Sequence, residues 1–268
     1  WELGFFYHSG FWGGVGRFLN FSNPNGLPYV WRMERLVCEA DAVSVSNRFL
    51  QKKFKGVLLP HCRDTSVLDP QKFSPGKIKE RIGLAGKKVV MFLGTPRPHK
   101  GIDDLLIALK KINIPELRLV IIGAENQQEF LKGVDPSVID RVVVLPKISF
   151  QNLPEFLSAA DIVAIPQRQT SDSVGQMPAK LFDAMSMAKP IIATRVSDIP
   201  EVLEDCGYLV DPSEPSQLAD CIQYILSHPA EAKTKGYAAR ERCKQRYDMH
   251  HLECGLHELV EHVSAKKG

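Results

Sequence analysis

The sequence has no stretch of about 18 consecutive apolar residues, so no segment is long enough to cross a bilayer as a helix. It also has no large excess of either charge, because 34 basic and 31 acidic residues give a net charge of only +3. This balance is too even for a protein that binds the phosphate backbone of a nucleic acid. We therefore expect a cytoplasmic globular protein without a nucleic-acid partner.

Two basic stretches leave open a peripheral contact with a membrane. Residues 51–55 and 233–246 are rich in lysine and arginine, and clusters of such residues bind anionic lipid surfaces. A solvated helix face explains the same residues equally well. Peripheral membrane contact is therefore an alternative within the cytoplasmic prediction.

Cysteine pairs and zinc spacings are missing as well. The six cysteines are scattered along the chain, so we expect six reduced thiols. His250, His251, Cys254 and His257 gather near the C-terminus, but their spacing matches no common zinc pattern and the segment resembles one amphipathic helix. We therefore expect no metal site there.

The middle of the chain alternates short apolar runs with helical patterns. Between residues 87 and 211 the runs are continuous and rich in β-branched residues, as in strands buried on both faces of a parallel sheet. Apolar residues recur at helical spacing in residues 102–109 and 218–225. The predicted fold class is α/β, with a doubly wound parallel Rossmann-like sheet. The predicted strands are residues 89–93, 119–122, 142–145, 162–165, 190–193 and 208–210.

The flanking regions carry weaker patterns. Residues 29–54 have an apolar side typical of a helix, and residues 231–268 have the composition of one or two charged helices. Residues 66–86 contain turn-forming prolines and glycines and are interpreted as a linker. Because the chain begins with a tryptophan in the middle of a pattern, we expect an upstream portion in the full protein.

A first loop suited to an anion has the sequence GTPRPHKG and follows the first predicted strand. Ligands of open parallel sheets bind at this end of the strands. Gly94 and Gly101 let the backbone approach a ligand closely, and a helix N-terminus follows. Arg97 and Lys100 supply cations, so a diphosphate fits the loop. The competing interpretation is a strand-to-helix turn with solvated basic side chains, because the loop matches neither the Walker A pattern nor the dinucleotide fingerprint.

A second loop follows the fourth predicted strand and ends at a proline that opens a helix. We expect the backbone N–H groups of Gly175, Gln176 and Met177 to face an anion. Asp183, further along the helix, is a candidate acceptor for the two hydroxyl groups of a ribose. The competing interpretation is an ordinary pair between Asp183 and Lys180 on a solvated helix face.

Several segments, in this order, resemble the C-terminal domain of retaining GT-B glycosyltransferases of family 4, the glycogen synthase and sucrose synthase type. They are GTPRPHKGIDDLLIAL, LVIIGAE, PAKLFDAMSMAKPIIAT and IPEVLEDCGYLVDP. The segment YVWRMERLVCEADAVSVSNRF resembles the end of the N-terminal, acceptor-binding domain, so that the resemblance covers about residues 30–230. It implies a GT-B fold with an incomplete second Rossmann-like domain.

The resemblance implies roles for residues at matching positions. Lys100 takes the place of the lysine that grips the donor diphosphate, with Arg97 beside it and Gly94 in the donor site. Asp183 takes the place of the second acid of a paired-acid motif that holds the ribose. The base of the nucleotide is expected against the loop that contains Lys147 and Ile148. His8, in a glycine-rich segment, is kept as an acceptor-side candidate.

Three positions depart from the family pattern. Thr95 stands where the family commonly has an arginine, so Arg97 would reach the phosphates from two residues later. Gly175 stands at the first acid of the paired-acid motif, with Asp172 as a nearby substitute. Asp183 is one methylene shorter than the usual glutamate.

The resemblance implies a chain in three parts. Residues 1–65 are expected to be a remnant of the acceptor-binding domain, 66–230 the nucleotide-sugar-binding domain, and 231–268 helices that pack back on the N-terminal part. The implied enzyme transfers a sugar from a UDP- or GDP-linked donor to a glycan or lipid-linked acceptor, with retention and without a metal or other cofactor, in polysaccharide or glycoconjugate biosynthesis. The alternatives left open are a non-catalytic homologue that binds a nucleotide sugar and a nucleotide sugar epimerase.

Overall fold

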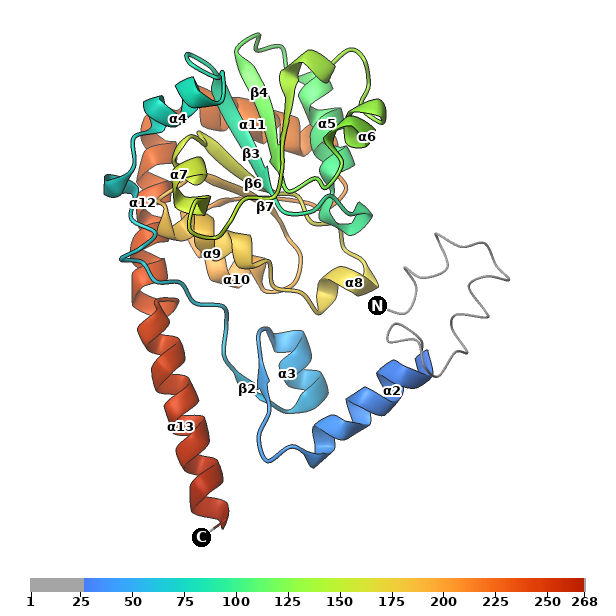
Figure 1. Cartoon of the computed structure of the whole chain (residues 1–268), viewed down its shortest axis with the longest axis vertical. Coiled ribbons are helices and arrows are strands. Elements are labelled where there is room, and N and C mark those ends of the chain that lie inside the picture. Colours follow the sequence, from blue (N-terminus) through green and yellow to red (C-terminus); the bar gives the residue numbers. More distant parts are fainter. Residues whose placement is uncertain (1–26, 268) are drawn as a thin grey trace.

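The computed structural model describes residues 27–267 and builds them around a six-stranded sheet (Figure 1). Its strands are β3 (Lys88–Leu93), β4 (Leu117–Ile122), β5 (Val142–Leu145), β6 (Ile162–Ile165), β7 (Ile191–Thr194) and β8 (Tyr208–Val210). All neighbouring strands pair in parallel, in the order β5-β4-β3-β6-β7-β8. The order reverses between β3 and β6, so the carboxyl ends of these two strands form the topological switch point.

The strands form where the sequence has continuous apolar runs. All four residues of β6 and of β7 are buried, as are five of the six residues of β3. Such burial follows because helices cover both faces of the sheet. The predicted doubly wound parallel α/β sheet is therefore confirmed, and the predicted strand ends differ from the observed ones by at most two residues.

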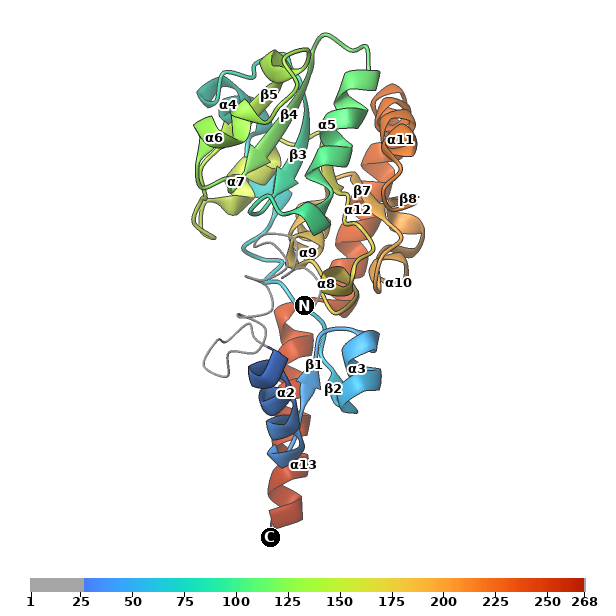
Figure 2. The same cartoon turned by 90° about the vertical axis from the view of Figure 1, so that its right-hand side faces the viewer.

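Three helices cover one face of the sheet, namely α5 (Ile102–Lys111), α6 (Gln127–Lys132) and α11 (Pro215–Ser227). Helices α5 and α11 lie side by side (Figure 2). Leu105 of α5 and Ile222 of α11 join Phe92 of β3 in one apolar cluster. The helices predicted from apolar spacing in these two segments are therefore confirmed.

The opposite face is covered by α4 (Pro75–Arg81), α7 (Leu153–Ser158), α9 (Ala179–Ser186), α10 (Ile199–Leu203) and α12 (Pro229–Arg246). Phe182 of α9 and Cys243 of α12 share a second apolar cluster with Met91 of β3. Helix α12 approaches the end of α9 closely, since a β-carbon on Gly236 would lie 2.4 Å from the carbonyl oxygen of Ala188. The remaining short helices of the sheet domain are η4 (Pro98–Lys100), η5 (Ile139–Arg141), α8 (Ser171–Val174) and η6 (Glu204–Cys206).

Residues 66–86 belong to this body, so their interpretation as a linker is wrong. They form η3 (Pro70–Lys72) and α4, and the side chains of Leu68, Ile78 and Leu84 are buried in the core. The prolines that indicated a break occupy the starts of η3 and α4, where a missing N–H leaves no hydrogen bond unmade.

The chain before residue 59 contains a small parallel βαβ unit. Its elements are β1 (Ser44–Val45), α3 (Arg48–Phe54) and β2 (Val57–Leu58), preceded by α2 (Leu27–Leu36) and η2 (Val37–Glu39). The helix predicted over residues 29–54 is therefore interrupted by a strand. Asn47 caps α3 and is fully buried, and its side-chain amide donates to the carbonyl of Val174 at 3.3 Å. This contact docks the βαβ unit on α8, the short helix before α9.

Two helices end the chain, as predicted. Helix α12 packs on the sheet domain, and α13 (Met249–Lys267) continues from it past the βαβ unit (Figures 1 and 2). A β-carbon on Gly255 of α13 would lie 2.6 Å from the side chain of Leu59, so α13 lies directly against the segment that follows β2. Among residues 27–267, no helix is long and apolar enough to span a membrane.

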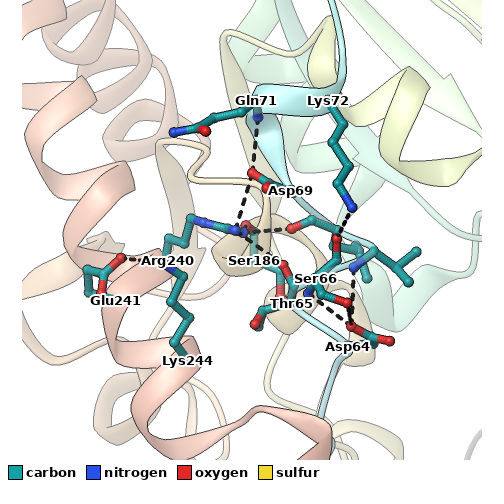
Figure 3. A network of polar contacts seen from close by, with 12 residues as sticks. Asp64, Thr65, Ser66, Asp69, Gln71, Lys72, Ser186, Arg240, Glu241 and Lys244 are labelled. Carbon is teal, nitrogen blue, oxygen red and sulfur yellow. Dashed lines mark hydrogen bonds and ion pairs between the residues drawn. The ribbon is translucent and has the colours of Figure 1, made fainter.

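A buried arginine ties α12 to two other parts of the domain (Figure 3). The guanidinium of Arg240 donates to the carbonyl oxygens of Leu68 at 2.6 Å and Thr65 at 3.2 Å. It also donates to the carbonyl of Ser186, at the end of α9, and pairs with Asp69 at 3.3 Å. These contacts offset the cost of taking the charge out of water, and they hold α12, α9 and the segment before η3 in one body.

Candidate functional site

The candidate site lies at the switch point, where the loops after β3 and β6 meet. A β-carbon on Gly101 would lie 1.8 Å from the carbonyl oxygen of Pro166, directly after β6. The N–H of Arg168 donates to the carbonyl of His99 at 2.8 Å. The two loops are therefore in backbone contact, and only glycine fits at position 101 because its φ of +67° is also left-handed.

Backbone glycines form the floor of the site. Gly94 has a φ of +123°, and a β-carbon there would lie 3.2 Å from the ammonium nitrogen of Lys100. Gly123, at the end of β4, packs so closely that its own β-carbon would lie 2.9 Å from the carbonyl carbon of Gly94. Lys100 therefore reaches back over the backbone of Gly94.

Two further cations act on Lys100, which lies at this floor. Partial burial, and then the charges of Arg97 and Lys180, lower the pKa of Lys100. Negative charge placed next to Lys100 would offset both its partial burial and the repulsion from these two cations. The sequence had indicated Arg97 and Lys100, whereas Lys180 was considered only as a partner of Asp183.

Another arginine at the switch point is not available to an anion. The guanidinium of Arg168 forms two hydrogen bonds with the carboxylate of Asp104, at 2.8 and 2.7 Å, and lies 3.7 Å from Asp103. The Asp104 pair raises the pKa of Arg168. This arginine therefore clamps the loop after β6 to the start of α5.

Asp183 lies inside the domain and not on its surface. Its side chain is fully buried in α9, so the solvated helix face considered from the sequence is wrong. The pair with Lys180 is present, with the ammonium nitrogen 3.4 Å from Oδ2. The guanidinium Nε of Arg63, from the segment between β2 and η3, donates to Oδ1. The sequence pattern did not indicate Arg63, which is 120 residues away along the chain.

The loop before α9 differs from the prediction. The N–H groups of Gly175 and Gln176 both donate to the carbonyl of Ser173, that of Gln176 at 3.0 Å, so the expectation that these two groups are free for an anion is wrong. The turn that closes α8 engages both groups. The side chain of Met177 is buried in the core. A β-carbon on Gly175 would lie 3.6 Å from Leu50 of α3, so Gly175 faces the βαβ unit.

The remaining candidates have the following positions. Thr95 is half-buried beside Gly94, and Asp172 belongs to α8. Lys147 is exposed, whereas Ile148 is half-buried against the core, in the loop after β5. His8 lies outside the residues that the structure describes. His250, His251, Cys254 and His257 lie on α13, and within residues 27–267 no three such side chains are placed to hold a metal ion.

The loop after β5 also approaches Arg63. The guanidinium carbon of Arg63 lies 6.0 Å from the ring centre of Phe150, whose side chain is largely exposed. His61 stacks edge-on against Phe182 at 6.1 Å, and burial lowers its pKa. The segment between β2 and η3 therefore contacts both the loop after β5 and α9.

A parallel six-stranded sheet in this order, covered by helices on both faces, has the architecture of one Rossmann-like domain of a GT-B fold. A family model described as glycosyl transferases group 1 matches residues 87–228, more than half of the chain. The chain belongs to this family. The predicted GT-B fold and the predicted family are therefore confirmed.

Curated relatives carry glycosyltransferase names. A GDP-mannose-dependent alpha-(1-6)-phosphatidylinositol monomannoside mannosyltransferase of Mycolicibacterium smegmatis is 27% identical over 78% of this chain and 59% of the relative. A D-inositol 3-phosphate glycosyltransferase of Segniliparus rotundus is 28% identical over 77% of this chain and 50% of the relative. The chain thus spans about half the length of the relatives it matches.

Solved structures support the fold. Anabaena HepE in complex with UDP superimposes with a TM-score of 0.72 at 21% identity, over 83% of this chain and 64% of that protein. Sucrose-phosphate synthase from Thermosynechococcus elongatus superimposes with a TM-score of 0.76 at 22% identity, over 94% of this chain and 66% of that protein. At this level of identity the likeness concerns the fold.

Proposed function

We propose that this chain is the nucleotide-sugar-binding part of an enzyme that transfers a sugar from a nucleoside diphosphate sugar to a glycan or lipid-linked acceptor. The observation that carries the proposal is the ammonium of Lys100 over the backbone of Gly94, 3.2 Å from the position that a β-carbon there would take, with the charges of Arg97 and Lys180 acting on it. A diphosphate would place negative charge next to this ammonium. Residues 1–65 would contribute to the acceptor side in this proposal.

The same cations explain how the reaction would be assisted. Negative charge grows on the leaving phosphate as the glycosidic bond breaks, and cations already in place stabilise that charge without reorganising. Lys100 is the group best placed for this role, because its ammonium is partly buried and faces the backbone floor. We propose that the transfer needs no metal and retains the configuration of the sugar, as the family resemblance implies.

The donor base is proposed to be uracil or guanine. The M. smegmatis relative is named for GDP-mannose, and the HepE structure holds UDP. The loop after β5, with Lys147 and Ile148, would face the base, and Asp183 would face the ribose. The phosphatidylinositol in the name of the relative supports a lipid-linked acceptor, with peripheral membrane contact as part of the proposal.

A binding protein without transfer activity is the second candidate. It is favoured by Gly175, which faces α3 and offers no acid to a donor sugar, and by Thr95, which offers no cation to the phosphates. In that case the chain would bind the nucleotide diphosphate and leave the donor intact. Transfer assayed with a glycan or lipid-linked acceptor separates the two candidates.

Calorimetric titration tests the shared part of both candidates. The chain would be titrated with UDP, GDP, ADP and TDP, each with and without magnesium ions. The proposal expects selective binding of UDP or GDP with the same affinity under both conditions. Binding that requires magnesium would contradict the metal-independent mechanism, and the absence of binding by all four nucleotides would contradict the proposed site.

A further inference from the structure

Arg63 lies where three parts of the molecule meet. Its backbone bridges to the turn between α12 and α13, since its N–H donates to the carbonyl of Tyr247 at 2.8 Å and its carbonyl accepts from the N–H of Met249 at 3.0 Å. Its side chain extends toward α9. The backbone of Arg63 is therefore anchored independently of the groups that its guanidinium contacts.

The guanidinium of Arg63 is fixed by all three of its nitrogens. Nε donates to Oδ1 of Asp183, one terminal nitrogen donates to the carbonyl of Cys62 at 2.7 Å, and the other donates to the carbonyl of Ala179 at 3.1 Å. The side chain is only 15% exposed. A planar group held at three points cannot turn without breaking several hydrogen bonds, so Arg63 is a rigid partner for the carboxylate.

Lys180 is bound to the same carboxylate much more loosely. Its ammonium lies 3.4 Å from Oδ2, and Oδ2 accepts no hydrogen bond from the residues that the structure describes. The side chain of Lys180 is 39% exposed, and its charge also acts on Lys100. A lysine in this position can exchange one anion for another, because its flexible stem costs little to move.

We propose that Arg63 is a positioning residue of the donor site, which holds Asp183 by Oδ1 so that Oδ2 is left to accept a ribose hydroxyl. Without nucleotide, Lys180 stays beside Oδ2. When the diphosphate binds, Lys180 moves toward it and Oδ2 accepts the hydroxyl instead. This inference rests on the proposed function, because it concerns the same donor, and it assigns a separate residue to the recognition of the ribose.

The arrangement explains why a fully buried carboxylate can serve a ligand. An isolated buried charge would be very costly, and a rigid guanidinium compensates it whether or not the ligand is present. If Arg63 were absent, Asp183 would draw Lys180 closer and would no longer be held in one orientation. Arg63 should therefore affect nucleotide binding only by holding the carboxylate of Asp183 in place.

The preference of the protein for a ribose nucleotide over its dideoxy form measures the positioning role of Arg63. The readout is the ratio of dissociation constants for the 2′,3′-dideoxy and ribose forms of UDP or GDP, whichever binds more tightly, determined by calorimetry well below the unfolding temperature. We expect the ratio to be about ten in the natural protein, the size of one hydrogen bond to a charged group. Arg63→Met and Asp183→Asn should each bring it close to one. In the double variant Arg63→Met/Asp183→Asn, the first substitution should have no further effect.

Two more variants serve as controls for misfolding and for the loss of an unrelated arginine. Arg63→Lys keeps the charge and supports folding but loses the three-point hold, so its ratio should also fall. Arg81→Met breaks an exposed arginine–carboxylate pair with Glu155, at 2.9 and 3.0 Å, and should leave the ratio unchanged.

The possible results separate the two proposals. An unchanged ratio in Arg63→Met, or an equal loss of affinity for both forms of the nucleotide, would overturn the role of Arg63. If Lys100→Ala weakens binding while the natural protein does not discriminate the two forms, the proposed function stands and the inference fails. No binding of UDP or GDP by the natural protein would overturn both.

Discussion

The ammonium of Lys100 lies directly over the backbone of Gly94, at 3.2 Å from the position that a β-carbon on Gly94 would take. Two residues of one loop thus form the floor and one wall of the candidate site. A side chain added at Gly94 would push on the ammonium of Lys100. A substitution at position 94 should therefore affect the candidate site through Lys100, in addition to any effect on the stability of the protein.

Gly94→Ala should weaken nucleotide binding. The new methyl group would displace Lys100 and would also force a non-glycine residue to a φ of +123°. Gly83→Ala is a matched control, because Gly83 has a φ of +71° and nothing within 4 Å of its β-carbon position. Both variants should lose stability on the order of 1–3 kcal/mol in chemical unfolding. Only Gly94→Ala should lose affinity in calorimetry, and equal affinity losses would contradict the account.

Arg240→Met should destabilise the domain strongly. It leaves Asp69 and three backbone carbonyl groups without their buried partner, and breaking a buried ion pair on one side costs about 3–5 kcal/mol. Urea unfolding measures the loss. Lys244→Met, one turn further along α12, breaks only an exposed pair with Glu241 at 2.8 Å and should change the free energy of unfolding by less than about 1 kcal/mol. Similar losses in both variants would show that Arg240 has no special role.

Lys189 should make stability depend on pH in alkaline solution. Burial lowers the pKa of Lys189 from 10.5 to about 8, although its ammonium donates to the carbonyls of Ser158 and Ala160. Between these two pH values the unfolded chain binds more protons than the folded one, so this group makes stability rise with pH. The thiols of Cys221, which is partly buried, and Cys243, which is buried, act in the opposite direction, because burial raises the pKa of each from 9.0 to about 11.

Comparison with Lys189→Met isolates the lysine, since both proteins keep the thiols. The free energy of unfolding of the natural protein, minus that of the variant, should increase between about pH 7 and about pH 9.5. A difference that is constant with pH would mean that Lys189 titrates alike in the folded and unfolded chain.

Much of the fold could be predicted because its information is local. Continuous apolar runs such as those of β3 and β6 indicate buried parallel strands wherever they occur. The glycines and cations of residues 94–101 likewise lie within one loop. Residues 66–86 were wrongly predicted to be a linker because proline is common both after the end of a helix and at its start. The burial of Ile78 and Leu84 shows that the prolines of this segment begin helices within the domain.

The rest of the site depends on distant contacts. Arg63 pairs with Asp183, which is 120 residues away along the chain. No sequence periodicity links an arginine in the segment between β2 and η3 to a carboxylate in α9. Lys180 lies three residues before Asp183 on one helix, so the sequence indicated this pair. The effect of its charge on Lys100 depends on how α9 lies relative to the loop after β3. The free N–H predicted for Gln176 failed because a four-residue helix closes just before it.

The central claim is that Lys100 belongs to a diphosphate site, and calorimetric titration of Lys100→Ala with UDP and GDP tests it most directly. Lys110→Ala is the control, because it removes an exposed lysine that pairs with Asp135 at 2.6 Å on the outer side of α5. The account predicts that Lys100→Ala weakens binding by about ten- to a hundredfold, the size of one charge-assisted contact, while Lys110→Ala binds as the natural protein does. Equal affinity of Lys100→Ala and the natural protein would contradict it.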